Sequence, residues 1–208
     1  MELRENEVPY VAKASAFLAG VDEAGRGPLA GPVVAAAVIL PSDFTVDRID
    51  DSKRLTALQR ERIYREICEN AVSVSWASMS ERVVDETGIL NATYAAMREA
   101  VGSLSVKPSF VLVDGYEIPH LEIPQAAFPK ADSSFLSVAC ASVVAKFVRD
   151  SMMHDAHEKF PQYGFNSHKG YGTRKHIEAL RRHGPCSLHR FSFRPVRETE
   201  SARKDLGS

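Results

Sequence analysis

The chain has 208 residues and a net charge of −1, and 44% of its residues are hydrophobic. These values predict one globular domain with a substantial core, and they exclude a protein that binds polyanions through its overall charge. No apolar run approaches the roughly 20 residues of a membrane span, and the first residues are too acidic for a signal or transit peptide. The three cysteines, Cys68, Cys140 and Cys186, form neither a zinc nor a disulfide pattern. We therefore expect a reducing, cytoplasmic location and no membrane partner.

The first part of the chain contains a glycine turn between two apolar runs. Residues 1 to 15 carry little pattern and are expected to form a short, loosely held lead-in. The runs Ala16 to Val21 and Pro32 to Leu40 predict two antiparallel strands around the turn. Asp22 and Glu23 stand between the first run and the turn. Neighbouring side chains of a regular strand point to opposite faces, so these acids share one site only where glycines break the strand.

This acidic turn has two simpler interpretations. It could be a solvated hairpin tip, since surface charges are common and mostly without function. The spacing of Gly25, Gly27 and Gly31 also resembles a dinucleotide-binding turn, which requires a helix after it. Residues 33 to 40 are rich in β-branched side chains and are followed by Pro41, which favours a buried strand instead.

The middle of the chain alternates between helices and strands. After a polar loop at residues 42 to 54, the predicted elements are a capped helix from Thr56 to about Asn70, a half-buried strand from Ala71 to Met79, a short helix from Ser80 to near Gly88, a helix from Ile89 to Leu104 and a strand from Phe110 to Val113. This order predicts a three-layer α/β or α+β domain with a mixed sheet.

Two more carboxylates stand at the ends of predicted elements. Asp114 directly follows the strand that ends at Val113, and Asp132 follows a short predicted strand from Gln125 to Pro129. After Asp132 comes a helix rich in serine and alanine, which we expect to lie close against the sheet. The simpler interpretation of Asp132 is a helix cap, worth about 1 kcal/mol.

The last third of the chain is basic. From Lys146 to Arg194 it has ten lysines and arginines and four acids, a balance of 10 − 4 = +6. Residues 162 to 172 form a loop dense in glycine, histidine, lysine and tyrosine, a helix is predicted from 173 to 183, and the tail from 197 to 208 is predicted to be disordered. A basic region beside an acidic cluster is typical of a protein that holds phosphates next to a metal site, although an ordinary solvated helix face is the alternative.

The acids predict metal-dependent chemistry. Hard oxygen ligands without histidine or cysteine select Mg²⁺ or Mn²⁺, and two such ions about 4 Å apart can promote phosphodiester hydrolysis without a protein nucleophile. His154 and His157 are three residues apart on a predicted helix, but they lack the rest of a zinc motif and are interpreted as surface or capping residues.

Several segments together resemble the bacterial ribonuclease HII family. In chain order they are Asp22-Glu23-Ala24-Gly25-Arg26-Gly27, Asp51-Ser52-Lys53, Val113-Asp114-Gly115, Lys130-Ala131-Asp132, Ala141-Ser142-Val143-Val144-Ala145-Lys146 with Arg149-Asp150, Gln162-Tyr163-Gly164-Phe165, His168-Lys169-Gly170-Tyr171 and Ser192-Phe193-Arg194-Pro195-Val196. Each motif is weak alone, but their common order over residues 16 to 196 is specific.

The resemblance implies a ribonuclease H-like fold with a helical C-terminal segment and hydrolysis of RNA in RNA/DNA hybrids, including incision 5′ of single ribonucleotides in DNA to leave 3′-hydroxyl and 5′-phosphate ends. It implies that the reacting complex contains two divalent cations, Mn²⁺ or Mg²⁺. Their protein ligands would be Asp22, Glu23, Asp114 and Asp132. Gly25, Arg26 and Gly27 would read the 2′-hydroxyl at the RNA-to-DNA junction, Tyr171 would stack on the next deoxyribose, and Lys53, Lys146, His168 and Lys169 would contact phosphates.

Some points stay open. Asp150 is interpreted as a structural ion-pair partner rather than a metal ligand, and we expect a monomer. The ribonuclease HIII family would share the four acids, but its pattern has a Gly-Lys-Gly turn and an additional N-terminal domain. The alternatives of another class are an inactive nucleic-acid-binding module and a metal-dependent small-molecule phosphatase. Retained acids argue against the first, and the basic, aromatic last third argues against the second.

Overall fold

The computed structural model describes residues 2–14, 17–46, 49 and 55–206. The chain forms two compact units, each built from separate stretches of sequence. Unit 1 contains Met1–Ala24, Val34–Ser78 and Tyr94–Phe147, and unit 2 contains Gly25–Val33, Met79–Thr93 and Val148–Ser208. No linker-like stretch marks this division in the sequence. The boundary between residues 24 and 25 falls inside the motif of the glycine turn, and the boundary between residues 33 and 34 falls inside an apolar run.

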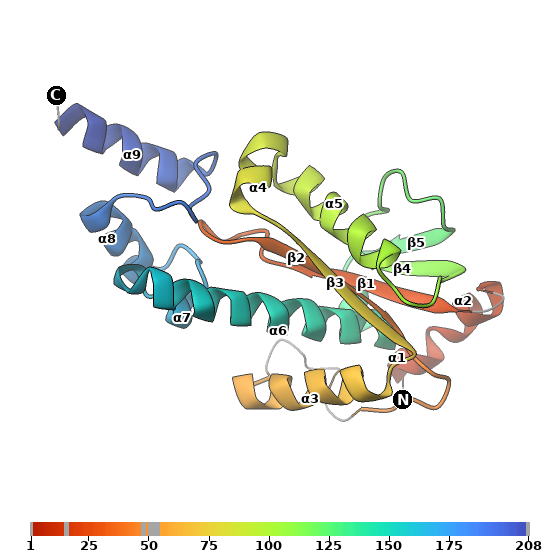
Figure 1. The fold of residues 1–208 in the computed structure, drawn as a ribbon. Coiled ribbons are helices and arrows are strands. Elements are labelled where there is room, and N and C mark those ends of the chain that lie inside the picture. The colour runs from red at the N-terminus through yellow and green to blue at the C-terminus, as the bar shows by residue number, and fades with distance from the viewer. Residues whose placement is uncertain (1, 15–16, 47–48, 50–54, 207–208) are drawn as a thin grey trace. The chain divides into compact units, whose positions relative to one another are not determined.

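The helices and strands follow the predicted order. The strands are β1 (Leu18–Ala24), β2 (Val33–Ile39), β3 (Ser73–Met79), β4 (Phe110–Asp114) and β5 (Gln125–Phe128). The helices, labelled in Figure 1, are α1 (Glu2–Glu5), α2 (Val8–Lys13), α3 (Ala57–Asn70), α4 (Glu81–Thr87), α5 (Ile89–Gly102), α6 (Leu136–Lys159), α7 (Phe165–His168), α8 (Arg174–His183) and α9 (Arg194–Leu206), with 3₁₀ turns η2 (Ala131–Ser133) and η3 (Pro161–Tyr163).

The five strands form one mixed sheet in the order β3-β2-β1-β4-β5. Strand β1 pairs antiparallel with β2 and parallel with β4, and β4 pairs parallel with β5. The central strands β1 and β2 are almost entirely buried, as their continuous apolar runs predict. The carboxyl ends of β1, β4 and β5 consequently lie at the same edge of the sheet.

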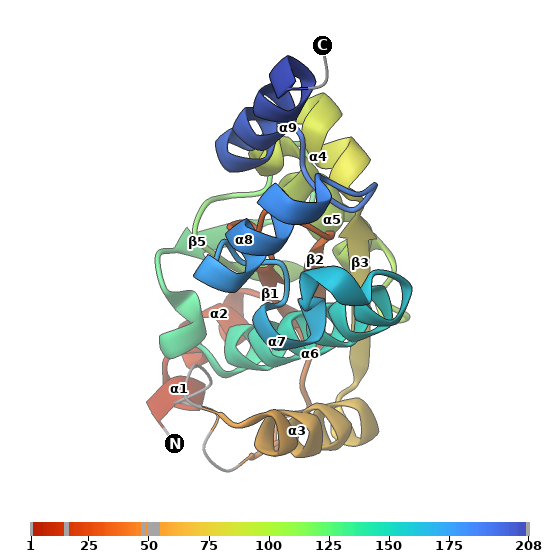
Figure 2. The ribbon, with the colours of Figure 1, turned by 90° about the vertical axis from the view of Figure 1, so that its left-hand side faces the viewer.

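Helices cover both faces of the sheet in unit 1. The part of α5 in unit 1 lies on one face and the part of α6 in unit 1 on the other, and α3 lies outside α6 in both views (Figures 1 and 2). Tyr64 on α3 stacks on Phe147 of α6 with ring centroids 4.0 Å apart. A capping box between Thr56 and Gln59 starts α3 at the predicted residue. This confirms the layered α/β architecture.

The start of α6 lies against the backbone of β1. A Cβ atom at Gly20 would lie 2.2 Å from the carbonyl carbon of Ser137 and 2.3 Å from the amide nitrogen of Val138. Val138, Ala139, Cys140 and Ala141 are fully buried. The prediction that a helix of small residues packs tightly on the sheet is therefore confirmed, and Gly20 is the residue on the sheet that permits it.

Replacement of Gly20 by alanine is expected to lower the free energy of unfolding by about 3 kcal/mol or more, because backbone atoms rather than a flexible side chain would have to move. Gly102, at the end of α5 with no atom within 4 Å of its Cβ position, is the matched control, and alanine there should be neutral or slightly stabilising. Urea unfolding of both variants measures the difference. Equal small effects would show that α6 can move away from β1 at little cost.

The lead-in is more ordered than the sequence predicts. Residues 2–5 and 8–13 form α1 and α2, and Glu7 between them is fully buried. Its Oε1 accepts hydrogen bonds from the amide of Ser137 at 2.6 Å and from the Ser137 hydroxyl at 2.5 Å. A carboxylate on amides at the start of a helix is favourable, so Glu7 anchors the lead-in to the start of α6.

Strand β3 buries its small side chains rather than its large ones. Ser73, Ser75 and Ala77 are buried, whereas Trp76 is 44% exposed. The Ser75 hydroxyl donates to the carbonyl of Ala100 on α5, so the strand lies close to that helix. Alternation predicts the strand correctly, but it does not identify the face that a neighbouring helix covers.

Unit 2 has its own apolar core, into which the final helix is anchored. Leu29, Leu180 and Val196 are buried together, with Ile177 and Phe193 packed against them. Val196 belongs to α9, which extends from Arg194 to Leu206 where the sequence predicts a disordered tail from residue 197. The anchor explains why this charged segment is helical, because one buried turn can nucleate a helix that propensity alone would not stabilise.

Candidate active site

Two of the predicted acids lie at the ends of adjacent parallel strands. Val21 on β1 is paired with Val113 on β4, so Asp22 and Asp114 occupy the next position on each strand. Asp22 is only 5% exposed, and Glu23 follows it on β1 at intermediate exposure. The strand ends thus bring Asp22, Glu23 and Asp114 to one edge of the sheet in unit 1.

The fourth acid is joined to this edge through its neighbour in the chain. Asp132 lies in η2, which follows β5, and is 4% exposed. The amide of Ala131 donates to Oδ1 of Asp114 at 2.6 Å, and the amide of Gly115 donates to the carbonyl of Phe128 at 3.0 Å. These bonds hold the start of η2 against the end of β4. Asp132 is therefore in the 3₁₀ turn before α6 rather than at the cap of that helix.

The electrostatics of Asp22 reflect a crowded acidic site. Burial raises the pKa of Asp22 well above its ordinary value, and the nearby charges of Glu23 and Asp114 raise it further. A hydrogen bond with Ser142 of α6 and the amide of Glu23, which donates to Asp22 Oδ1 at 2.7 Å, act in the opposite direction. Burial and the two neighbouring acids thus disfavour the carboxylate form of Asp22, and a cation would favour it.

The chemistry of these side chains fits a hard divalent cation. Carboxylate oxygens and one hydroxyl face the site, and no histidine or cysteine is among the groups that shift the pKa of Asp22. Among the described residues, no three His, Cys, Asp or Glu side chains are close enough together, as they stand, to hold an ion. One oxygen of Asp22 and one of Asp114 bond to backbone amides, which fixes each carboxyl group in place.

The predicted glycine turn belongs to unit 2 and is built around a buried arginine. Arg190 is fully buried, and its guanidinium donates to the carbonyls of Gly25, Arg26, Pro28 and Gly31 at 2.7 to 3.1 Å. Gly25 has a φ of +101°, a backbone conformation that residues with a Cβ atom rarely adopt. The chain itself joins the turn to the acids, because only Ala24 separates Glu23 from Gly25.

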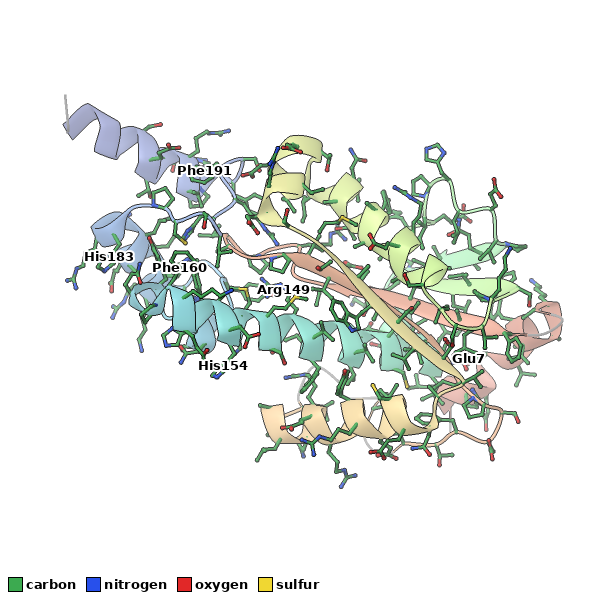
Figure 3. All side chains as sticks on the ribbon, in the orientation of Figure 1. Glu7, Arg149, His154, Phe160, His183 and Phe191 are labelled. Carbon is green, nitrogen blue, oxygen red and sulfur yellow. The ribbon has the colours of Figure 1, made fainter. Side chains whose placement is uncertain are left out.

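A second buried arginine connects the turn to the loop that carries Tyr171. Arg149 on α6 (labelled in Figure 3) donates to the carbonyls of Ala30, Pro32 and Lys169 at 3.2, 2.9 and 3.0 Å. Its guanidinium lies over the Tyr171 ring, 5.9 Å from the centroid. A Cβ atom at Gly27 would lie 3.7 Å from Tyr171 Cε1, so the turn and the exposed tyrosine are neighbours within unit 2.

The two basic residues before Tyr171 differ in their surroundings. His168 uses both ring nitrogens within its own loop, bonding the carbonyl of Tyr163 at 2.8 Å and the amide of Gly170 at 3.3 Å. Burial lowers the pKa of His168, which makes it less often charged at neutral pH. Its role as a phosphate contact stays a prediction, and these contacts favour a role in shaping the loop. Lys169 donates from Nζ to the carbonyl of Asn166 at 2.8 Å.

A buried histidine pair supports the same loop. His176 Nδ1 is 3.0 Å from the carbonyl of Tyr171, and its Nε2 is 3.1 Å from Nε2 of His189. Burial lowers the pKa of both histidines to about 4, so the pair is neutral at pH 7. One ring then donates the proton in the shared bond, and the backbone at Tyr171 is held without a buried charge.

The remaining predicted residues are placed as follows. Lys146 lies on the part of α6 in unit 1, and Lys53 lies outside the described residues. Burial lowers the pKa of Arg149, and the nearby charges of Tyr171 and Asp150 act in the opposite direction. The structural ion-pair role of Asp150 stays a prediction. No sequence pattern indicates that Arg149 and Arg190 are buried, because an arginine in a basic segment is normally exposed.

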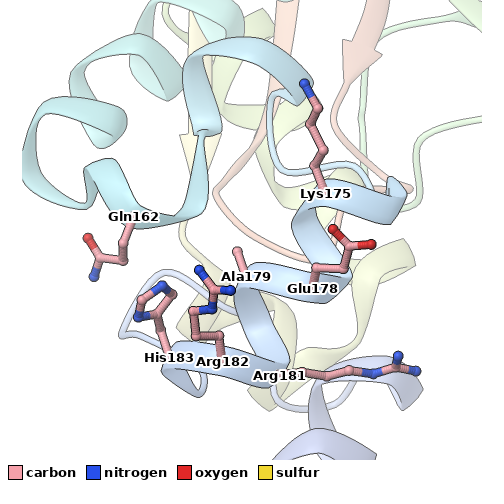
Figure 4. A pocket seen from close by; sticks show the side chains of 7 residues that line it. All are labelled: Gln162, Lys175, Glu178, Ala179, Arg181, Arg182 and His183. Atoms are coloured by element: carbon pink, nitrogen blue, oxygen red, sulfur yellow. The ribbon is translucent and has the colours of Figure 1, made fainter.

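The basic last third includes a cavity of about 680 Å³ on α8 of unit 2. Figure 4 shows its lining, which is formed by Gln162, Lys175, Glu178, Ala179, Arg181, Arg182 and His183. None of the four acids lines it. In the part of the chain that the structure describes, no helix is long and apolar enough to cross a lipid bilayer.

Comparison with known proteins agrees with this geometry. A family model described as ribonuclease HII matches residues 19–196. A ribonuclease HII of Caldicellulosiruptor bescii is 48% identical over 177 residues, which are 85% of this chain and 86% of that protein. A ribonuclease HII of Bacillus thuringiensis (strain Al Hakam) is 44% identical over 198 residues, which are 95% of this chain and 77% of that protein.

Solved structures show the same fold. The ribonuclease H2 of Pyrococcus horikoshii superimposes with a TM-score of 0.77 at 24% identity, over 90% of this chain and 99% of that chain. The ribonuclease HII of Archaeoglobus fulgidus, solved in complex with PCNA, gives 0.70 at 27% identity, over 83% and 91%. Bst ribonuclease HIII in complex with Mn²⁺ gives 0.68 at 19% identity, over 92% and 71%. Because the family model covers most of the chain and these relatives are 44% to 48% identical to it, this chain belongs to the ribonuclease HII family. It is a hydrolase of the ribonuclease H type that acts on RNA/DNA hybrids.

Proposed function

We propose that this protein incises duplex DNA on the 5′ side of single embedded ribonucleotides, in addition to hydrolysing the RNA of longer hybrids, and leaves 3′-hydroxyl and 5′-phosphate ends. The observation that carries this proposal is the direct connection of two features. The acids around the buried Asp22 include Glu23, and the glycine turn begins two residues after Glu23 at Gly25. One short segment of chain therefore joins the proposed catalytic acids to the turn that would recognise the ribose.

The four acids are the proposed catalytic residues. Asp22, Glu23, Asp114 and Asp132 would hold divalent cations, Mg²⁺ or Mn²⁺, through carboxylate oxygens. Bound there, the cations would supply the charge that activates a water molecule and stabilises the leaving 3′-oxygen. The protein fixes the carboxyl groups in advance, since backbone amides hold Asp22 and Asp114, and the Ser142 hydrogen bond favours the ionised form of Asp22.

The glycine turn and the following loops are the proposed recognition elements. Gly25, Arg26 and Gly27 would contact the 2′-hydroxyl, which distinguishes RNA from DNA at a given position. The absence of a side chain at Gly27 leaves room beside Tyr171, whose exposed ring would stack on the deoxyribose that follows the ribonucleotide. Lys53, Lys146 and Lys169 would contact phosphates, which position the strand without reading its sequence. His168 would act through the shape of the same loop, because both of its ring nitrogens are bonded within it.

Replacement of Tyr171 by alanine is expected to lower kcat/KM about ten- to a hundredfold on a duplex with one ribonucleotide, since stacking on an aromatic ring is worth about 1–3 kcal/mol. The loss on a uniform hybrid should be smaller, because many ribose positions can occupy the site. Trp76, also exposed but on β3, provides a control in which alanine should affect both substrates equally or not at all. Equal losses for Tyr171→Ala would contradict junction reading by this ring.

Mapping of the cut ends tests the proposed reaction. A duplex with one ribonucleotide, labelled at the 5′ end of the cut strand, should give a single product that ends one nucleotide before the ribose. That product should be extended by a DNA polymerase, which requires a 3′-hydroxyl, and the downstream fragment should be ligatable, which requires a 5′-phosphate. A cut on the 3′ side, or cleavage of uniform hybrid alone, would refute the proposal.

A further inference from the structure

The side chain of Arg190 is committed in full to the glycine turn. A guanidinium has five N–H donors, and here each makes one bond. Nε donates to the carbonyl of Gly31 at 3.0 Å, Nη1 to those of Arg26 and Pro28 at 3.1 and 2.8 Å, and Nη2 to those of Gly25 and Gly31 at 2.7 and 2.8 Å. Four carbonyls of one seven-residue turn are thus fixed by one side chain.

These bonds determine which groups the turn can present to a ligand. The carbonyls of Gly25, Arg26, Pro28 and Gly31 are bonded to the buried guanidinium, so the turn directs these acceptors toward Arg190 rather than toward a nucleic acid. Burial lowers the pKa of Arg190 to about 10, and the nearby charge of Arg149 contributes, but the group stays protonated at neutral pH. A positive charge thus lies beneath the turn, where it favours the approach of a phosphate or a polarised hydroxyl.

We propose that Arg190 is the positioning residue of junction recognition: it holds the Gly25–Gly31 turn in the one shape that reads a single 2′-hydroxyl, and so it sets the preference for an isolated ribonucleotide over a uniform hybrid. This inference rests on the proposed function. Arg190 is fully buried, and it acts through the turn rather than on the substrate.

Lysine cannot replace this arginine. An ammonium group has three donors and no planar fork, so it can satisfy at most three of the four carbonyls. At least one buried carbonyl would lose its partner, and the turn would relax toward shapes in which that carbonyl meets water. The positive charge would remain, so the substitution separates the shape of the turn from its charge.

The neighbouring contacts show that the position of Arg190 is fixed from both sides. Its own amide donates to the carbonyl of Leu29 at 2.9 Å. The next two residues are held by Asp85 of α4, whose carboxylate accepts from the amide of Phe191 at 2.8 Å and from the amide and hydroxyl of Ser192 at 2.9 and 2.6 Å. Replacement of Asp85 by alanine should loosen this segment while all five donors of the guanidinium are kept, although it also removes a charge that raises the pKa of Arg190.

The experiment compares Arg190→Lys with Tyr163→Phe as a matched control. Tyr163 is buried in the same unit and donates from its hydroxyl to the carbonyl of Gly184 at 2.7 Å, so phenylalanine also removes a buried bond to a carbonyl, but away from the turn. For each variant, kcat and KM are measured on a duplex with one ribonucleotide and on a uniform hybrid, at a temperature well below the melting midpoint. Asp85→Ala is the second test variant, in case Arg190→Lys does not fold.

The expected result is a change in preference rather than a general loss. Arg190→Lys should lower kcat/KM on the single ribonucleotide about ten- to a hundredfold. The ratio between the two substrates should fall at least about tenfold, and Asp85→Ala should change it in the same direction by a smaller factor. Tyr163→Phe should leave the ratio between the two substrates at the wild-type value, even if it lowers the melting midpoint as much as Arg190→Lys does.

Two outcomes would overturn the inference. If Arg190→Lys and Asp85→Ala lower the activity on both substrates equally, Arg190 has only a structural role. If Arg190→Lys keeps the wild-type ratio while folded, the turn does not need this guanidinium for its shape. A wild-type enzyme that fails to incise at single ribonucleotides would instead refute the proposed function, and this is measured in the same experiment.

Discussion

Replacement of Asp22 by asparagine should lower kcat on every RNA-containing duplex by on the order of 10³-fold or more. The change removes one negative charge from the group of acids that would hold the cations, and stabilisation by metals is worth several kcal/mol in such reactions. Asparagine keeps the shape of the side chain and the acceptor for the Glu23 amide, so the local fold should be retained. Asp114→Asn should have a similar effect, and initial rates at saturating substrate measure both.

The same substitution should stabilise the protein when no divalent cation is present. Burial and the charges of Glu23 and Asp114 raise the pKa of Asp22, so its ionised form opposes folding at neutral pH. Such a carboxyl binds its proton more tightly in the folded state, and its unfavourable contribution disappears as the pH falls toward the unfolded value near 3.9. The melting midpoint of Asp22→Asn should therefore exceed that of the wild type by a few degrees at pH 7, and the difference should shrink on acidification.

A control separates this effect from a general change in charge. Asp43 is exposed and lies in unit 1, so Asp43→Asn makes the same chemical change on a carboxylate that water surrounds. It should alter neither kcat nor the melting midpoint measurably. Full activity in both Asp22→Asn and Asp114→Asn would refute the assignment of these residues as catalytic. An unstable but active Asp22→Asn would instead indicate a structural carboxylate.

Removal of divalent cations should stop cleavage almost completely. Dialysis against chelator should lower cleavage of both hybrid and single-ribonucleotide duplexes by at least about 10³-fold, and Mg²⁺ or Mn²⁺ should restore it. Because a cation binds the folded state alone, a concentration 100 times its dissociation constant should add about 2.7 kcal/mol to the free energy of unfolding. The same cation concentration should raise the free energy of unfolding of Asp22→Asn by less, because this variant lacks one carboxylate ligand.

Duplex binding provides the control for chelation. Basic residues in unit 2 should hold the nucleic acid without a metal, so a gel-shift measurement in chelator should still show a complex. Unchanged cleavage in the presence of chelator would contradict the metal assignment. Loss of binding together with loss of cleavage would show that the cations serve to bind the duplex rather than to cut it.

The sheet and the acidic site could largely be predicted from the sequence. Long apolar runs predict β1 and β2 because a strand buried on both faces has no polar alternation. Asp22 and Asp114 follow such runs, and parallel strands carry the residues that follow them to the same edge. Ser80 and Thr173 mark the starts of α4 and α8, since their side chains accept from amides three residues later.

The remaining features depend on contacts between distant parts of the chain. The burial of Arg190 results from four carbonyls about 160 residues earlier in the sequence, and no local pattern encodes such a partner. The same is true of Glu7, which is buried because it bonds Ser137. Helix α9 forms because Val196 is anchored in a core, although the residues after it resemble a disordered tail. Tertiary contacts therefore determine the burial of Arg190 and Glu7 and the formation of α9, and local sequence patterns do not predict them.

Cleavage of two labelled duplexes by the wild-type enzyme tests the proposed site and its recognition turn together. One duplex is a DNA with a single ribonucleotide and the other is a uniform RNA/DNA hybrid, each with Mg²⁺, Mn²⁺ or chelator. We expect metal-dependent cleavage of both, with a single cut on the 5′ side of the lone ribonucleotide. Cleavage of the hybrid alone would contradict the role of the glycine turn in junction reading. Binding of both duplexes without any cleavage would contradict the catalytic role of the acids.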